Sequence, residues 1–327
     1  MSYLAFLKKT PNKLVKVGSC CSKILKKLIS KVKNFINKLS NLKTSNLNLG
    51  KLHIQRGNIS DAILRFKLVD KFLDPGNKIA SYWLLWSYVL NNDFKEAKKY
   101  INRDGVDKEL ARFIKKFDNI TVVPTSIYSL RRELIPKDYV NKFQDQRHDI
   151  VKILVKNFLK QATNLPSSYA IAEFGSADGI LSNELSLRLQ NNFKLISTEL
   201  SRQLIKLQTI HYSGKKLQDE LHCMPAEEYI KNCQRKFDAI FSLEGFSYYS
   251  DLSNFFKKIY DLLKEKGYFA FVLRDAKRTH CNFQLLEYSY NKSEIELFLT
   301  KNKFIILSKT HFPLDNGVNY NIFICCK

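Results

Sequence analysis

The sequence predicts an α/β domain with a seven-stranded sheet, preceded by an α-helical domain. From residue 169 onward, short apolar runs typical of strands alternate with amphipathic helical segments, which is the pattern of a parallel sheet covered on both faces. Only a polar loop, PLDNGVN, separates the last two expected strands, so they should form an antiparallel hairpin. We therefore expect a mostly parallel, Rossmann-like sheet whose last strand is antiparallel.

The seven expected strands are Tyr169–Phe174, Phe193–Thr198, Glu220–Met224, Phe237–Ser242, Tyr268–Leu273, Phe304–Thr310 and Asn321–Cys325. Helices are expected between the early strands, for example over Leu252–Lys264. A further helix, from about Tyr139 to Phe158, leads into the sheet. Proline residues interrupt the pattern before that helix, so residues 118–137 are expected to be irregular.

The chain contains 327 residues and has a formal net charge of +23. Its length suggests about two domains. The charge has two explanations, attraction to an anionic partner or a composition rich in Lys, Asn and Ile that an AT-rich genome imposes, and we favour the second. Residues 1–45 stand out, because they contain eleven lysines and no acidic residue.

The seven cysteines include no CxxC pair, so the sequence predicts neither a metal site nor a thioredoxin-like redox site. Reduced thiols are the simplest interpretation, and they favour a cytosolic compartment. No apolar run reaches the roughly 18 residues of a membrane-spanning helix, and the N-terminal part lacks the pattern of a signal peptide. We expect a cytoplasmic protein.

Residues 22–42 predict a basic amphipathic helix. Ile24, Leu28, Val32 and Ile36 recur at helical spacing, and lysines lie opposite them. Such a helix can lie on an anionic membrane, which would make the protein membrane-peripheral through residues 1–45. The alternative, which we favour, is that the apolar stripe packs on the next helices of the same chain.

Residues 46–104 resemble about two tetratricopeptide repeats. Ala62 and Ala97 are 35 residues apart, close to the tetratricopeptide period of about 34. Small residues at Gly50 and Ala62 would let paired helices approach closely, with Phe66 filling the gap. The resemblance implies a protein or peptide partner on a concave face, and the alternative is a helical cap on the neighbouring domain.

The stretch AIAEFGSADGILS, residues 170–182, joins the first strand to a helix through a turn of small residues. Such a turn brings backbone N–H groups to a ligand. The dinucleotide fingerprint would need a glycine where Ile180 stands, which argues against a bound dinucleotide. An ordinary strand–helix turn, capped by Asp178 or Ser176, is the alternative.

The spacing Glu173-x-Gly175-x-Ala177-x-Gly179 resembles motif I of the class I S-adenosylmethionine-dependent methyltransferases. KFDAIFSLEGFSYYSDL, residues 236–252, resembles the stretch that follows the fourth strand in the same families. With the repeat-like helices, residues 45–327 resemble the predicted methyltransferases that carry tetratricopeptide repeats. The resemblance implies a class I methyltransferase that binds S-adenosyl-L-methionine.

The same resemblance implies the cofactor-binding residues. Glu199, at the end of the second strand, would accept hydrogen bonds from the ribose hydroxyls. Two positions depart from the family pattern, since Ala177 replaces the commoner glycine and Pro225 stands where Asp is common. The full predicted cofactor set is Glu173, Gly175, Ser176, Ala177, Gly179, Glu199, Leu200, Ala226, Glu227, Ser242 and Glu244.

Methyl transfer needs an aligned nucleophile and the exclusion of water more than it needs an obligatory base. Tyr248 and Glu244 follow the fourth strand and are the predicted catalytic residues, Tyr248 to orient the nucleophile and Glu244 to accept a proton. The alternative is that Tyr248 packs in the core and Glu244 touches only the cofactor. His148, on the helix before the sheet, is expected to be a surface or packing residue.

Three functions follow from these patterns: methylation of a protein docked by the repeats, methylation of a small molecule or carrier-bound acyl group, or an inactive binding scaffold. The sequence argues against a nucleic-acid acceptor, because SLEGF at 242–246 lacks the Asn/Asp-Pro-Pro-aromatic motif of amino-group DNA methyltransferases. The expected divisions are a basic segment (1–45), helical repeats (46–104), a linker with a lid helix (105–165) and the methyltransferase domain (166–327).

Overall fold

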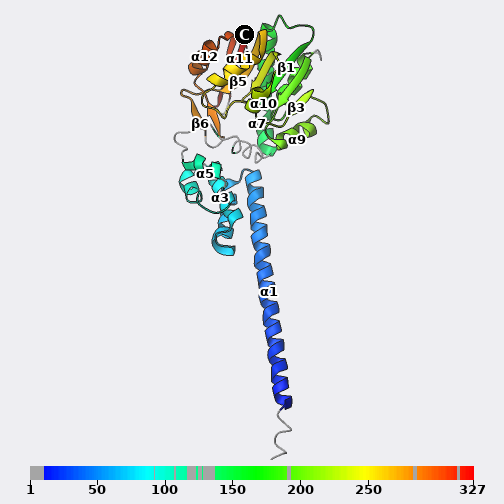
Figure 1. Cartoon of the computed structure of the whole chain (residues 1–327), viewed down its shortest axis with the longest axis vertical. Coiled ribbons are helices and arrows are strands. Elements are labelled where there is room, and N and C mark those ends of the chain that lie inside the picture. The colour runs from blue at the N-terminus through cyan, green and yellow to red at the C-terminus, as the bar shows by residue number, and fades with distance from the viewer. Residues whose placement is uncertain are drawn as a thin grey trace, which may run out of the picture.

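A computed structural model of the chain describes residues 11–91, 93–106, 108–115, 123, 127, 137–189, 193–282, 286–314 and 317–327; side chains are described from residue 29 onward and, in the helix that begins at residue 137, from residue 147. Figure 1 shows a sheet between layers of helices and, closer to the N-terminus, a smaller helical unit. Most of the region expected to be irregular, 118–137, lies outside the described residues.

The central sheet has seven strands in the order β3-β2-β1-β4-β5-β9-β8. Strand β9 runs antiparallel to both of its neighbours, and the other described pairings are parallel. All seven expected strands are present, so the predicted α/β fold is confirmed. Their bounds are β1 Tyr169–Phe174, β2 Phe193–Thr198, β3 Glu220–His222, β4 Phe237–Leu243, β5 Leu263–Arg274, β8 Ile305–Pro313 and β9 Asn319–Cys326.

Helices cover both faces of the sheet because side chains alternate along each strand. Ile171 belongs to the core formed with α7 and α8, whereas its neighbour Ala172 belongs to the core formed with α10, α11 and α12. The predicted helix before the sheet is α7, and the expected Leu252–Lys264 helix is α11. The helices of this part are α7 Lys137–Gln161, α8 Ile180–Arg188, α9 Arg202–His211, α10 Ala226–Asn232, α11 Ser253–Leu262 and α12 Lys292–Lys301.

A short hairpin of β6 (His280–Asn282) and β7 (Glu287–Ser289) was not expected from the sequence. It packs on the loop that follows β4. The Tyr290 hydroxyl, next to β7, donates to the backbone oxygens of Phe246 and Tyr249, at 2.9 and 2.6 Å. The hairpin therefore supports the loop that carries the predicted catalytic residues. Strands of three residues are too short to leave a periodic signal.

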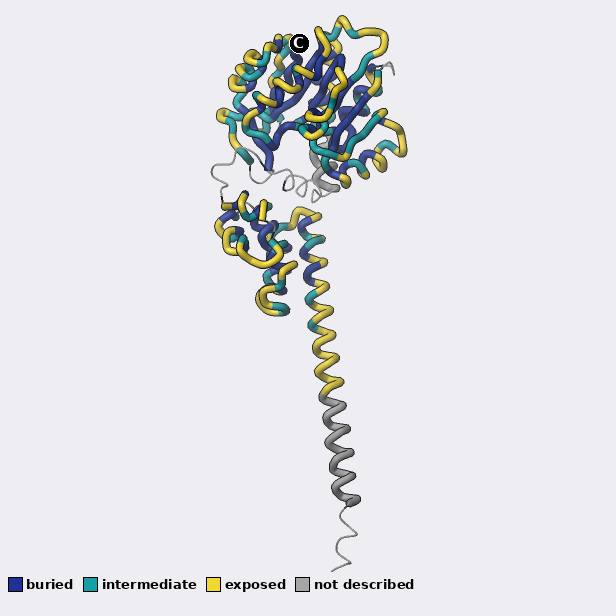
Figure 2. The backbone as a smooth tube through the Cα atoms, in the orientation of Figure 1, coloured by how far each residue is buried: buried dark blue, intermediate teal, exposed yellow. Residues whose placement is uncertain are grey.

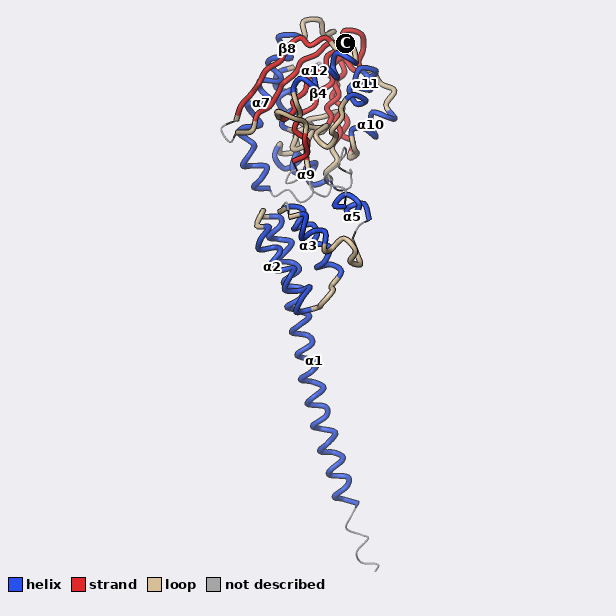
Figure 3. The backbone as a smooth tube through the Cα atoms, turned by 90° about the vertical axis from the view of Figure 1, so that its left-hand side faces the viewer, coloured by secondary structure: helices blue, strands red, loops and turns tan. Residues whose placement is uncertain are grey.

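The helical unit contains the C-terminal end of α1, which Figure 3 shows beside α2 and α3. A Cβ on Gly50 would lie 2.5 Å from the Phe66 ring, so the close approach predicted at this glycine is present. Phe66, Ala62 and Ala97 are buried, as expected of core positions. The elements are α1 Pro11–Gln55, α2 Ile59–Leu68, a π-helical turn η1 Val69–Leu73, α3 Lys78–Leu90, α4 Phe94–Lys98 and α5 Lys108–Lys115.

Helix α1 differs from the prediction in two ways. It is one continuous helix of 45 residues, which joins the predicted basic segment to the first repeat helix without a break. The stripe over residues 29–42 does not pack on the following helices, because Ile29, Val32 and Ile36 are exposed in the structure (Figure 2). Leu39 is half-buried, and full burial begins at Asn46, so the favoured interpretation is wrong for Ile29–Ile36; the side chains of Ile24 and Leu28 lie outside the described residues. Among the described residues, no helix is both long and apolar enough to cross a membrane.

Candidate active site

The small-residue turn lies at the carboxyl ends of β1 and β2, the edge where open α/β sheets bind ligands. The backbone N–H groups of Gly175 and Ser176 both donate to the Thr198 carbonyl, at 3.1 and 3.0 Å. Gly175 has φ of 82°, a left-handed conformation that favours glycine. These two hydrogen bonds join the turn directly to the end of β2.

Two glycines face each other between this turn and the loop after β4. A Cβ on Gly175 would lie 2.7 Å from the Gly245 Cα atom, and a Cβ on Gly245 would lie 2.0 Å from the Phe174 carbonyl oxygen. Neither position has space for a side chain. Gly245 was missed in the sequence, where SLEGF offers no local sign that its glycine meets the first strand.

Ala177 occupies the position where the family pattern has glycine, and its φ of 49° is left-handed. This conformation costs an alanine about 1–2 kcal/mol. The Ala177 N–H donates to the Glu199 carboxylate at 2.8 Å, which helps to hold the turn in place. The structure therefore keeps the glycine-like backbone here and adds a methyl group to it.

Gln208, on α9, holds the other side of the turn. Its amide nitrogen donates to the Ser176 hydroxyl at 2.9 Å and to the Ala177 carbonyl at 2.7 Å. Gly179 has φ of 83°, and a Cβ there would lie 3.1 Å from Gln208 and 2.8 Å from Leu217. The sequence analysis missed Gln208, although a glutamine among the apolar positions of an amphipathic helix could have marked it.

Glu173 lies beneath the turn and is fully buried. Its carboxylate accepts hydrogen bonds from the hydroxyl groups of Ser182 and Ser197, which come from α8 and β2. Burial raises the pKa of Glu173 to about 7, and the two serine hydrogen bonds lower it only in part. The side chain links β1, β2 and α8, and its predicted contact with the cofactor stays a prediction.

Glu199 comes directly after β2 and is buried. One carboxylate oxygen accepts from the Ala177 N–H and the other from the Ser201 N–H, both at 2.8 Å. The acid predicted to bind ribose hydroxyls is therefore next to the turn, and it already stabilises it. Leu200 follows and is half-buried.

Ser242 and Glu244 lie at the end of β4. The Ser242 hydroxyl donates to the Phe174 carbonyl at 3.0 Å and accepts from the Gly245 N–H at 3.1 Å, so it joins β4 to β1. Glu244, with φ of 58°, pairs with Arg274 at 3.3 Å. Burial alone would lower the pKa of Arg274, but the carboxylates of Glu244 and Glu287 raise it above its ordinary value. Arg274 is a second site residue that the sequence analysis missed.

Tyr248 is buried, and its hydroxyl donates to the Glu227 carboxylate at 2.5 Å. Burial and a hydrogen bond with the same carboxylate raise the pKa of Tyr249. Glu227 is at the start of α10, where Pro225 precedes the helix and Ala226 is buried. The structure therefore pairs Tyr248 with Glu227, and Glu244 with Arg274.

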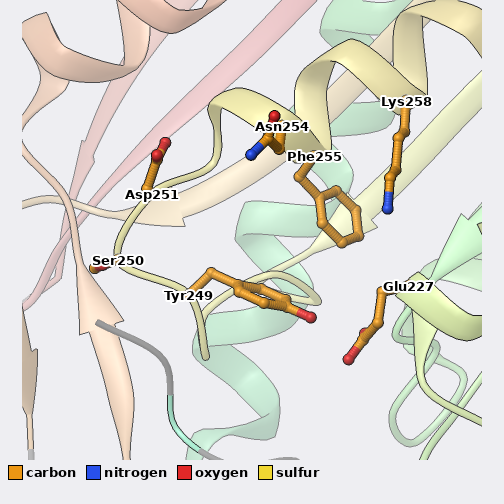
Figure 4. A pocket seen from close by; sticks show the side chains of 7 residues that line it. All are labelled: Glu227, Tyr249, Ser250, Asp251, Asn254, Phe255 and Lys258. Carbon is orange, nitrogen blue, oxygen red and sulfur yellow. The ribbon is translucent and has the colours of Figure 1, made fainter. Parts of the chain in front are cut away.

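A pocket of about 470 Å³ lies beside this tyrosine pair (Figure 4). The Tyr249 hydroxyl points towards Glu227, and the Phe255 ring lies close to the Tyr249 ring. Lys258, on α11, lies on the same side of the pocket as Glu227 in this view, and Asp251 lies on the other side. The lining residues are Glu227, Tyr249, Ser250, Asp251, Asn254, Phe255 and Lys258.

Helix α7 also contacts the turn. Arg147 forms an ion pair with the buried Asp178 at 3.3 Å. Asp178 does not cap α8, because Gly179 is the N-cap residue and no side chain bonds the free N–H groups there. His148 is half-buried on the same helix. Among the described residues, no group of acidic, histidine and cysteine side chains could hold a metal ion.

A protein-family model agrees with this geometry, and the chain is also similar to solved structures. Residues 143–305 match the model of a family described as a methyltransferase domain. A SAM-dependent methyltransferase from Leishmania major has 12% identity and a TM-score of 0.52, over 66% of this chain and 90% of that one. The 1,6-didemethyltoxoflavin-N1-methyltransferase of Burkholderia thailandensis, solved with S-adenosylhomocysteine, has 13% identity and a TM-score of 0.43, over 64% and 92%. No curated protein sequence is a significant match.

Residues 143–305 are therefore a class I S-adenosylmethionine-dependent methyltransferase domain, and S-adenosyl-L-methionine is its cofactor. The residues at the turn fit that cofactor. Gly175 and Gly179 have no Cβ, so Gly245 of the β4 loop and Gln208 of α9 pack directly against the turn and fix its path, and an acid follows β2 at Glu199.

Proposed function

We propose that this chain, whose residues 143–305 form a methyltransferase domain, is an active enzyme that methylates a small-molecule acceptor. The observation that carries the proposal is the turn after β1, which neighbouring segments hold in place. Gly175 lies against Gly245, and the Ala177 backbone is hydrogen-bonded to both Gln208 and Glu199. These contacts hold the turn in one conformation, which supports a preformed cofactor site. The volume of the pocket at Tyr249 is within the usual range of small-molecule sites, about 300–1,000 Å³.

Each part of the site has a distinct role in this proposal. Gly175, Ala177 and Gly179 would hold the methionine part of the cofactor, Glu199 the ribose, and Ala226 with Glu227 the adenine. The bound cofactor supplies a methyl group on a positively charged sulfur, which is already a strong electrophile. The protein therefore has to align the acceptor and exclude water.

Tyr248 is suited to align an acceptor. Its hydroxyl donates to Glu227, which fixes the position of the phenol oxygen, and a phenol group can accept from an N–H or O–H group as well as donate. Glu244 would take up the proton that the nucleophile loses, and Arg274 holds its carboxylate in position. The tyrosines and Phe255 would keep water from the reacting groups.

Calorimetric titration of the full chain with S-adenosylmethionine, with NAD as the control ligand, tests the cofactor site. We expect micromolar binding of the first and none of the second. Gly175→Val should abolish binding, because its side chain would meet Gly245. Gly214→Val is the matched control, since Gly214 also has positive φ but nothing lies within 4 Å of its Cβ position. Equal binding by the two variants would contradict the proposed role of the turn.

The acceptor is tested by incubating the chain with cell extract and cofactor labelled in the methyl group. The extract is separated by size before and after the reaction. Label in the low-molecular-mass fraction, absent with Gly175→Val, is the expected result. No transfer to any fraction, despite cofactor binding, would identify the domain as a binding scaffold.

A protein acceptor docked by the helical unit is the second candidate. It is favoured by an apolar row on α2 and η1, where Leu64, Leu68 and Phe72 are 63%, 37% and 75% exposed. Label in the macromolecular fraction that is lost with Leu64→Ser and Phe72→Ser would favour this candidate. Cofactor affinity should be unchanged in both variants, because neither residue belongs to the methyltransferase domain.

A further inference from the structure

Helix α1 carries an apolar stripe that nothing covers among the described residues. Ile29, Val32, Phe35 and Ile36 are 58%, 55%, 62% and 57% exposed. Single exposed apolar residues are common on protein surfaces, but a contiguous row of them marks a site of interaction. The row lies on the part of α1 that extends beyond the helical unit (Figures 1 and 2).

The uncovered stripe continues a face that is buried further along the same helix. At three- and four-residue steps, Ile29, Val32 and Ile36 lead through Leu39 and Lys43 to Leu47, Gly50 and Ile54. These last three positions are buried, Gly50 against Phe66 of α2. This face of α1 is therefore buried against the helical unit at Leu47, Gly50 and Ile54, whereas no described residue covers it at Ile29, Val32 and Ile36.

Lys43 marks the boundary between the two parts. Its ammonium group pairs with Asp74, after η1, at 3.2 Å. Before Lys43 the stripe is apolar again, with Leu39 half-buried and Ile29, Val32 and Ile36 exposed. The helical unit ends at this ion pair, so α1 extends further than its own fold requires.

The charges around the stripe have one sign. Lys31, Lys33 and Lys38 lie outside an apolar arc of about 140°, when residues are placed at 100° intervals around the helix. The first acidic residue of the chain is Asp61. An apolar stripe that contains an aromatic ring, with lysines as the only charged residues beside it, is the pattern of a helix that lies in the interface of an anionic membrane.

We propose that residues 29–42 of α1 lie on an anionic lipid surface, with the apolar stripe inserted and the lysines at the headgroups. Other occupants fit less well. A second copy of α1 would bring lysines against lysines with no acid to pair them. Nucleic acid would attract the lysines, but it would not use a row of isoleucine, valine and phenylalanine.

Vesicle sedimentation of the full chain tests the proposal. We expect binding to vesicles of phosphatidylcholine with phosphatidylserine, little binding to phosphatidylcholine alone, and weaker binding as salt rises. Val32→Ser with Ile36→Ser should lower binding at least tenfold, because two inserted side chains are lost. Lys31→Gln should lower it about fivefold. Asn34→Ser with Asn37→Ser, on the polar side of the same helix, is the matched control and should bind as the unmodified chain does.

Three results would overturn the proposal. Equal sedimentation by the Val32/Ile36 variant and the asparagine control would show that the stripe does not insert. Absence of vesicle binding, with a dimer in solution that Val32→Ser and Ile36→Ser dissociate, would assign the stripe to a second copy. Binding to RNA or to an acidic protein, without binding to vesicles, would assign the lysines to that partner. Cofactor titration of each variant checks that the fold is retained.

Discussion

The turn after β1 and the projecting part of α1 are built in opposite ways. At the turn, backbone and side-chain atoms from β1, β2, the β4 loop and α9 meet within hydrogen-bonding distance, and two glycines exclude any side chain. In α1, residues 29–42 are mostly exposed, and the only feature is a periodic pattern of charge and hydrophobicity. Single atoms should therefore matter at the turn, whereas in α1 only the pattern should matter.

The largest expected effect in this comparison is at Gly245. Gly245→Ala would place a Cβ 2.0 Å from the Phe174 carbonyl, so the first strand or the β4 loop must move. We expect a loss of about 3 kcal/mol or more in the free energy of unfolding. Urea denaturation measures it, with Gly57→Ala as the control, in which the cost comes from the positive φ alone because nothing lies within 4 Å of the Cβ position. If Gly245→Ala loses no more unfolding free energy than the control, close packing at the turn does not distinguish it from α1.

The next effect concerns pH and Glu173. Because burial raises the pKa of Glu173 from 4.5 to about 7, the folded state binds more protons than the unfolded state between these values. Its contribution to stability is complete below pH 4.5 and is lost as the pH rises towards about 7.

Glu173→Gln should remove that loss, so the variant should gain about 3 kcal/mol relative to the unmodified chain as the pH rises through this window. Denaturation curves across the window test it, with Glu228→Gln, an exposed acid on α10, as the control. If the difference in unfolding free energy between Glu173→Gln and the unmodified chain does not change with pH across this window, Glu173 stays ionised in the folded protein.

A smaller effect is expected at Ala177. Ala177→Gly relieves the cost of a left-handed alanine, but glycine also gains entropy in the unfolded chain, so stability should change by less than about 1 kcal/mol. Removal of the methyl group should tighten binding of S-adenosylmethionine roughly threefold, because the cofactor can approach the turn more closely. Ser213→Gly is the control, since Ser213 also has positive φ, of 50°, outside the turn. Equal cofactor affinity in both variants would mean that the methyl group does not narrow the site.

The smallest effect is expected in α1. Val32→Ser with Ile36→Ser, studied without lipid, should change the free energy of unfolding by no more than about 1 kcal/mol in total, because both side chains are already exposed. Thermal denaturation measures the change. A loss of several kcal/mol would mean that the stripe is covered in solution, and the comparison between the two regions would fail.

The parts of the fold that depend on local pattern were predictable. Most strands of the sheet leave a short apolar run, although the three-residue β3 does not, and the polar loop before residue 320 indicates the antiparallel pair. Gly175 and Gly179 were likewise recognisable. Gly175 directly follows the first strand and Gly179 directly precedes the next helix, and a connection this short requires a tight turn. The family model confirms the class of domain and the cofactor that these positions indicated. The resemblance of residues 46–104 to tetratricopeptide repeats stays a prediction.

Contacts between distant segments were decided only in the tertiary structure. Gly245 is constrained by Phe174, about seventy positions earlier, and Gln208 by Ser176 on another element, so neither constraint leaves a mark in the neighbouring sequence. The amphipathic pattern of α1 is the same whether α2 covers it or nothing does, and so periodicity could not separate Ile54 from Ile36. Sequence by itself determined which faces are apolar and where the cofactor turn lies. The tertiary structure decided which of those faces are covered, because burial depends on what the rest of the chain can reach.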